Sequence, residues 1–196
     1  MIDAATLVDR VRTALVASES TQAIEQVLYD LLAAGSPREL RRALLGVEAA
    51  ERMSGSPRFG QHVFVDSPDL TIFHATLPPG FVNAPHDHRS WAVVAVYEGE
   101  ERNVFYQRRD DTLVPVASLV ATAPRVVVMA EDAIHAIENR LATASHAIHV
   151  YGNAHLHVAR SMWHPETLHE EPRDDRVFGA WSRDMVARGV RLPALE

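Results

Sequence analysis

The stretch that decides the fold of this chain is Gly80-Phe81-Val82-Asn83-Ala84-Pro85-His86-Asp87-His88. It places two histidines one residue apart, just before a run of β-forming residues that ends at Glu98-Gly99. Because alternate side chains of a strand point to the same face, His86 and His88 can reach one interior point while Asp87 points away from it. Neutral imidazole is a common protein ligand of iron, zinc, copper and nickel, so the stretch predicts part of a metal site.

A third histidine completes the predicted site. His135 lies in Ala133-Ile134-His135-Ala136-Ile137-Glu138-Asn139, shortly after a β-rich run at residues 126–129. Together His86, His88 and His135 can hold a metal through three imidazoles and leave positions open for a substrate and for oxygen. We therefore expect these three side chains to be the metal ligands.

Composition narrows the class of protein. The chain has 196 residues, 47% hydrophobic and 23% charged, which is usual for one folded domain. The net charge is −7 and the basic residues are scattered, so no nucleic-acid partner is expected. The sequence has neither an apolar run long enough for a membrane nor the pattern of a signal peptide, so a cytoplasmic protein without membrane partners is expected. Without cysteine, any metal must be held by histidines and carboxylates.

Residues 1–55 predict a helical segment that packs on the main domain, because so short a segment rarely has a core of its own. Its apolar residues recur at helical spacing. Ser36-Pro37-Arg38-Glu39 has the form of a capping box with proline at the first helical position. The helix that follows is expected to turn three apolar side chains toward the core: Leu40, Leu44 and Val47. The small residues Ser54-Gly55-Ser56-Pro57 mark the end of this segment.

Between residues 56 and 165 the hydrophobic period changes from about 3.6 to about 2, which predicts a domain of many short strands. Residues 98–102 are expected to form a solvated hairpin, and residues 166–196 a C-terminal extension with a helix near 178–186. The expected strands are 62–65, 70–76, 91–97, 103–107, 126–129, 147–151 and 155–160.

The two histidine motifs resemble those of the cupin superfamily. The spacing G-x5-H-x-H, then a β run ending in glycine, then H-x3-N, covers residues 80–139. The resemblance implies a mainly β fold, the cupin double-stranded β-helix or jelly-roll barrel, with the helical segment before it. The usual cupin carries a ligand glutamate a few residues after the second histidine, but residues 89–93 contain no carboxylate. A site of three histidines is therefore implied.

The chain resembles the cysteine dioxygenase family and bacterial relatives such as 3-mercaptopropionate dioxygenase. The features that carry this resemblance are the missing ligand glutamate, the stretch Pro85-His86-Asp87-His88 and the later His149-Val150-Tyr151. Those enzymes use one Fe(II) per chain and O2 to convert a thiol to a sulfinate. They carry a Ser-His-Tyr relay at alternate positions of a strand. His149 and Tyr151 match the relay and are implied to be catalytic, whereas Ala147 stands at the position of the serine.

The mercaptopropionate enzymes also hold the substrate carboxylate with an arginine that follows the relay tyrosine. Arg160 matches this position, so the resemblance implies that it binds the substrate. A guanidinium suits this role because it binds a carboxylate through two parallel charge-assisted hydrogen bonds. His155 and His157, in the same region, are expected to be structural or solvated.

These residues predict an iron-dependent thiol dioxygenase that converts a small thiol acid, such as 3-mercaptopropionate or cysteine, to its sulfinate. One alternative keeps the metal as a Lewis acid in a non-redox cupin lyase, isomerase or hydrolase. Another is a non-catalytic cupin that binds a small ligand. Oxygen uptake coupled to thiol loss favours the thiol dioxygenase. Turnover without oxygen favours the non-redox metal enzyme, and a purified protein without stoichiometric metal favours the non-catalytic binding protein.

Overall fold

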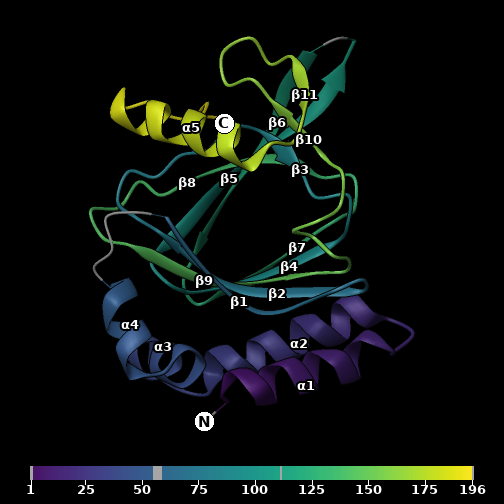
Figure 1. Ribbon diagram of the computed structural model, residues 1–196, viewed down its shortest axis with the longest axis vertical. Coiled ribbons are helices and arrows are strands. Elements are labelled where there is room, and N and C mark those ends of the chain that lie inside the picture. The colour runs from purple at the N-terminus through teal and green to yellow at the C-terminus, as the bar shows by residue number, and fades with distance from the viewer. Residues whose placement is uncertain (1, 55–58, 111, 196) are drawn as a thin grey trace.

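The computed structural model describes residues 2–54, 59–110 and 112–195. Its centre consists of two antiparallel β-sheets that face each other, with helices on the outside of both (Figure 1). The five-stranded sheet has the order β1-β2-β9-β4-β7, and the six-stranded sheet has the order β11-β10-β3-β8-β5-β6. The strands are β1 (Gly60–Ser67), β2 (Leu70–Leu77), β3 (His86–Asp87), β4 (Ala92–Glu98), β5 (Glu100–Arg109), β6 (Thr112–Thr122), β7 (Arg125–Met129), β8 (Ile134–Glu138), β9 (Ser145–Tyr151), β10 (Ser161–Trp163) and β11 (Glu170–Pro172).

The interior between the sheets is filled mainly by apolar side chains from alternate strand positions, as the two-residue period of a strand requires. Strands β2 and β9 are buried along their whole length, because the interior covers one face and the N-terminal helices cover the other. The interior cluster includes Phe73, Ala75, Val94, Val96, Val127 and Ala147.

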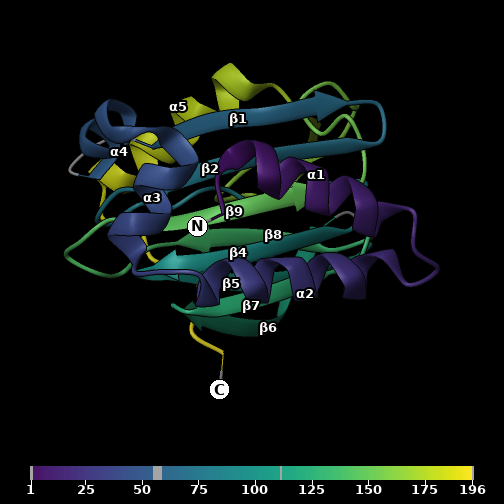
Figure 2. The same cartoon turned by 90° about the horizontal axis from the view of Figure 1, so that it is seen from below.

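Four helices lie on the outer face of the five-stranded sheet (Figure 2). They are α1 (Ala4–Leu15), α2 (Ser20–Ala33), α3 (Pro37–Leu45) and α4 (Val47–Ser54). The apolar stripes of α1, α2 and α3 form one core with the outward side chains of the sheet, so that Leu28 packs in the same cluster as Val93 and Ile148. None of the described helices is long and apolar enough to cross a membrane.

The third helix was predicted correctly at its start and wrongly at its end. Both reciprocal hydrogen bonds of the capping box between Ser36 and Glu39 are present. Gly46, with φ 77°, ends this helix, and a separate helix begins at the next residue. The change of direction leaves Val47 56% exposed, so the prediction that it enters the core is wrong. Gly55, Ser56 and Pro57, which were expected to end the helical segment, lie outside the described residues.

Two further sequence expectations are corrected. Residues 155–160 form turns rather than a strand, and the next strand begins only at Ser161. The hairpin expected at 98–102 is not solvated as a whole, because β5 begins at Glu100 and carries Glu101 and Arg102 into buried positions. The Arg102 guanidinium donates to a carboxylate oxygen of Glu138 over 2.8 Å, which explains how this charge is tolerated in the interior.

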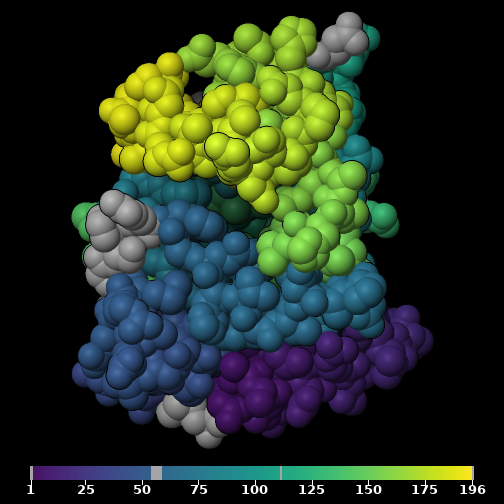
Figure 3. Space-filling model, in the orientation of Figure 1, coloured from purple at the N-terminus to yellow at the C-terminus, as the bar shows by residue number. Residues whose placement is uncertain are grey.

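The C-terminal segment covers the six-stranded sheet at the end of the molecule opposite the N-terminal helices (Figure 3). Its helix α5 (Asp175–Ala187) turns Phe178 and Met185 inward, where they pack in one cluster with Val104 and Trp163. Asp174 caps the helix by accepting hydrogen bonds from two backbone N–H groups of the first turn. The segment therefore contributes to the core on the side of the barrel that carries the predicted metal ligands.

We expect Leu28→Ala to lower the free energy of unfolding by about 2–5 kcal/mol, since it removes a fully buried side chain between α2 and the sheet. Urea unfolding monitored by circular dichroism measures the change. Gln22→Ala, on the exposed face of the same helix, is the control and should change stability little. Equal stability of both variants would mean that the helices do not share a core with the sheet.

Candidate metal centre

The three histidines predicted as ligands meet at one end of the barrel interior. Within the six-stranded sheet His86 lies directly opposite His135, in adjacent antiparallel strands. Such opposite residues have Cβ atoms about 4.5–5.5 Å apart, so the register alone brings these two rings together. His88 follows β3, and the ligand atoms of all three buried residues lie within 4.8 Å of one another.

The hydrogen bonds of the rings fit a metal at their centre. An amide oxygen only accepts, so the 2.7 Å contact of His135 Nδ1 with Asn103 Oδ1 puts the ring proton on Nδ1. The lone pair of His135 Nε2 then points toward His88 Nε2, 3.0 Å away. His86 Nδ1 donates to the carbonyl oxygen of Ala84 over 3.2 Å, which also leaves its Nε2 free. Anchoring the outer nitrogen in this way is typical of metal-binding histidines.

The ring proton of His88 can lie on either nitrogen. Among the described residues, His88 Nδ1 is buried without a hydrogen-bond partner. If His88 Nε2 carried the ring proton and donated it to His135, this Nδ1 would be a bare acceptor in the interior, which is unfavourable. A cation between the Nε2 atoms instead puts the His88 proton on Nδ1 and gives the lone pairs of His88 and His135 a common partner. The three residues therefore fit a divalent metal through the convergence of their ligand atoms.

Burial keeps these rings in the form that binds metal. It lowers the pKa of His135 to about 3, with a smaller contribution from His149. Burial, and after it the charge of His135, also holds the pKa of His86 and of His88 well below the ordinary value. Only the neutral imidazole has a lone pair for a metal, so binding at neutral pH does not have to displace a ring proton.

The aspartate between the first two histidines is turned away from the centre. Asp87 accepts from Arg89 Nε and from the backbone N–H of Ser161, each over 2.7 Å. In the part of the chain that the structure describes, the group that can hold a metal consists of histidines alone. Asn139, the last residue of the second motif, is structural, because its side-chain amide donates to the carbonyl oxygens of Leu77 and Pro78.

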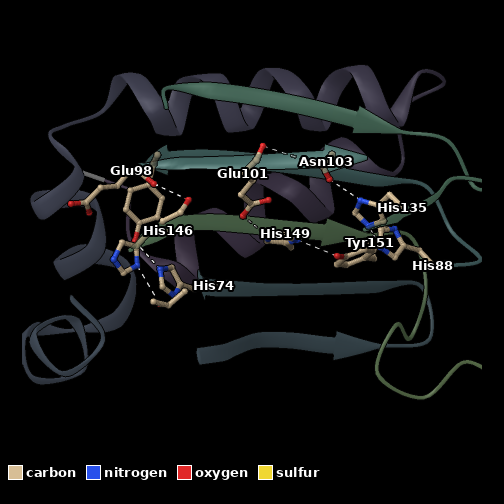
Figure 4. A network of polar contacts seen from close by, with 12 residues as sticks. His74, His88, Glu98, Glu101, Asn103, His135, His146, His149 and Tyr151 are labelled. Atoms are coloured by element: carbon tan, nitrogen blue, oxygen red, sulfur yellow. Dashed lines mark hydrogen bonds and ion pairs between the residues drawn. The ribbon is translucent and has the colours of Figure 1, made fainter. Parts of the chain in front are cut away.

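The residues expected to be catalytic reach the metal centre along β9 (Figure 4). The ring of Tyr151 meets that of His88 edge to face, with centroids 4.9 Å apart. Its hydroxyl lies 3.1 Å from His149 Nδ1, and His149 Nε2 lies 3.4 Å from a carboxylate oxygen of Glu101. Ala147 faces the same interior without a hydroxyl. Sequence reasoning missed Glu101, because an acidic residue next to a glycine turn is usually solvated.

His155 was also missed, since it was expected to be structural or solvated. Its ring stacks on that of Tyr151 with centroids 3.8 Å apart and meets His88 edge to face at 5.3 Å. Burial, followed by the charge of Arg160, lowers its pKa to about 2. The turn that brings it back to the tyrosine begins at Gly152, directly after β9. His155 thus forms part of the wall beside the metal ligands.

Arg160, expected to bind a substrate carboxylate, lies after these turns and is only 8% exposed. Its charge acts on Tyr151 and His155, which places the guanidinium on the face that holds the metal ligands. Within the described residues no hydrogen-bond or ion-pair partner of this guanidinium is found. A buried, unpaired cation of this kind is suited to an anionic ligand.

A second arginine accompanies it. The Arg173 guanidinium lies 3.4 Å above the ring centroid of Phe178, and its Nε donates to Asp175 over 2.7 Å. Its Nη1 is buried without a partner in the described part of the chain. Burial and the neighbouring charge of Arg160 lower the pKa of Arg173 to about 10. Because the Phe178 ring also meets His86 edge to face, at 5.2 Å, the C-terminal segment reaches the metal centre.

Comparison with known proteins finds distant structural similarity. No family model matches the chain, and no curated protein matches its sequence. A double-stranded β-helix protein from Klebsiella pneumoniae is similar over 50% of this chain and 74% of its own, with 14% identity and a TM-score of 0.42. For an RmlC-like cupin from Methanocaldococcus jannaschii the coverages are 50% and 84%, the identity 15% and the TM-score 0.42. An oxalate oxidase is similar over 53% of this chain and 55% of its own, with 18% identity and a TM-score of 0.41.

The pairing of the strands identifies the fold. Strands that are distant in sequence, such as β2 with β9 and β3 with β8 and β10, pair to close two facing antiparallel sheets around one interior. The fold is a double-stranded β-helix. The three histidines that could hold a metal come from β3, from the residue that follows it and from β8. The mainly β fold expected from the sequence is confirmed.

We expect His86→Ala, His88→Ala and His135→Ala each to abolish stoichiometric metal while the protein stays folded, because two imidazoles make a poor site. Metal analysis after loading with Fe(II) or Zn(II), together with circular dichroism, measures both properties. His157→Ala is the control, since this side chain is 74% exposed and pairs with Asp66 at the surface. Full occupancy in any one of the three variants would show that the replaced histidine is not a ligand.

The metal-free protein should lose stability as the pH falls from 7.5 to 5. Burial keeps the pKa of His74 at about 3 and of His146 at about 4, and His135 and His155 are lowered as well. These groups stay neutral in the folded state, whereas unfolded histidines take up protons below about 6.5, so each costs about 2 kcal/mol at pH 5. Urea unfolding in chelator tests this. A free energy of unfolding that does not change with pH would contradict the prediction. His74→Gln should make the free energy of unfolding depend less steeply on pH.

Proposed function

We propose that this chain is a ferrous thiol dioxygenase that converts a small thiol acid to its sulfinate. The observation that carries the proposal is a buried centre of three neutral histidines that shares one face with Tyr151 and Arg160. Among the described residues no carboxylate joins this centre, and the Arg160 guanidinium has no hydrogen-bond or ion-pair partner. Fe(II) held by His86, His88 and His135 would supply coordination positions for the thiol sulfur and O2, and the redox chemistry between them.

The reaction balances without another reductant. Both atoms of O2 are transferred to sulfur, which loses four electrons while O2 gains four, and the thiol becomes a sulfinic acid. One O2 is consumed for each thiol. The protein supplies positioning, a closed interior and defined hydrogen bonds, because the ligand face is walled by the rings of Tyr151, His155 and Phe178. Tyr151 is placed to hydrogen-bond to the substrate at this face.

The charge around the centre supports an acidic substrate. Arg160 and Arg173 are both largely buried, and the metal adds two further positive charges. Asp175 offsets part of this charge, and Asp87 is paired with Arg89. An occupant with a thiolate and a carboxylate offsets two of the remaining positive charges, whereas the ammonium group of an amino thiol adds one. We therefore propose 3-mercaptopropionate or a similar thiol acid as the substrate.

An oxygen electrode tests the proposed reaction. Protein loaded with Fe(II) should consume O2 and 3-mercaptopropionate in equal amounts and form the sulfinate. Cysteine, cysteamine and aromatic thiols complete the substrate set. Absence of thiol-dependent oxygen uptake with every thiol would overturn the proposal. Turnover of a substrate under strict anaerobiosis would assign the centre to Lewis-acid chemistry instead.

We expect Arg160→Ala to lower kcat/KM for 3-mercaptopropionate while leaving metal content unchanged. A buried carboxylate that loses its partner costs about 2–5 kcal/mol, which corresponds to a decrease of about 30-fold to several thousand-fold. The activity with cysteamine, which lacks a carboxylate, should not decrease. Arg176→Ala, an exposed change in α5, is the control.

The two substrates separate a binding role of Arg160 from a structural one. An equal loss with both thiols would mean that the arginine supports the fold rather than the carboxylate. A parent enzyme that prefers cysteamine would overturn the thiol-acid substrate itself, because an ammonium group is repelled by the two arginines.

A further inference from the structure

Glu101 places a carboxylate inside the barrel, far from solvent. The residue is 1% exposed and lies on β5, on the same face as Asn103, which binds His135. Neighbouring interior positions are mostly apolar, among them Val96 and Ala121. A carboxylate at such a position is unfavourable unless it accepts hydrogen bonds or pairs with a charge, so its partner is informative.

That partner is His149. In the described part of the chain, the one side-chain contact of the Glu101 carboxylate is with His149 Nε2, at 3.4 Å. The side-chain amide of Asn103 is directed to the backbone oxygen of Glu101 and not to its carboxylate. The His149 ring is also fixed from the side, because Phe73 stacks on it with centroids 5.1 Å apart and planes 11° from parallel.

An ionised Glu101 side chain has only acceptors, so in that form the contact requires a proton on His149 Nε2. A neutral imidazole then has its lone pair on Nδ1, and this atom lies 3.1 Å from the Tyr151 hydroxyl. The phenol must therefore donate its proton to His149. The lone pairs of the phenol oxygen remain for a group on the ligand face, beside His88 and His155 (Figure 4).

We propose that Glu101 is a positioning residue that fixes the ring tautomer of His149 and so makes Tyr151 a hydrogen-bond acceptor toward the ligand. The ligand class that this arrangement selects carries a proton at the contact point, such as the S–H of a thiol that has entered but has not yet bound to the metal as a thiolate. The part of the proposal that concerns turnover rests on the proposed function. The part that concerns the tautomer does not.

Long-range ¹H–¹⁵N correlation spectra of the chelated, metal-free protein report the tautomer directly. In the parent, His149 should be protonated at Nε2 and bare at Nδ1. Glu101→Gln keeps an acceptor oxygen and should preserve this tautomer. Glu101→Leu removes the acceptor, so the His149 proton should no longer be confined to Nε2. Glu100→Gln is the matched control, since the preceding position of the strand faces away from His149. A parent protonated at Nδ1, or a Leu variant with the tautomer of the parent, would overturn the proposal.

Kinetics then test the consequence for turnover. Glu101→Leu should lower kcat for thiol-dependent oxygen uptake by about 10–100-fold, with bound iron and KM close to those of the parent, as for other outer groups around metal sites. Glu101→Gln should lose less. Unchanged kcat in Glu101→Leu would overturn a role in turnover. If the Leu variant does not fold, the parent spectrum and the Gln variant still decide the tautomer. A parent without oxygen uptake would overturn the proposed function but not the assignment of Glu101.

Discussion

The pairing of β3 with β8 is the constraint on which the rest of the site depends. It sets His86 opposite His135 across two adjacent strands, and the residue that follows β3 brings in His88. The same sheet continues to β5, whose register puts Asn103 beside the outer nitrogen of His135. A shift of one residue in this pairing would turn one imidazole out of the interior and remove the centre.

A second consequence of the closed barrel is that polar residues from both sheets meet in its interior. Glu101 belongs to the six-stranded sheet, whereas His149 and Tyr151 belong to the five-stranded sheet. Their side chains form one line of contacts that leads from a buried carboxylate to the ring of His88. The apolar surroundings that make an unpaired carboxylate costly also make its hydrogen bonds decisive, because few alternative partners exist.

Much of this architecture could be predicted from the sequence, because it depends on local periods. The alternation of strands indicates that 86 and 88, and likewise 149 and 151, share a face, and the capping box places the start of α3. Glu101 and His155 could not be predicted in the same way. Each lies in or next to a turn whose local sequence is typical of solvent exposure. Glu101 is buried against His149 of β9, and His155 is buried against Tyr151, the last residue of that strand. Val47 was misjudged because Gly46 ends the helix before it.

In the proposed function, the three histidines hold iron in a form that binds the thiol substrate directly. X-ray absorption at the iron edge, measured on the Fe(II)-loaded protein with and without 3-mercaptopropionate, tests it most directly. The account requires three imidazoles around the iron and one new sulfur neighbour when the thiol is added. A spectrum that gains no sulfur neighbour, or that shows fewer than three imidazoles before the thiol is added, would contradict it.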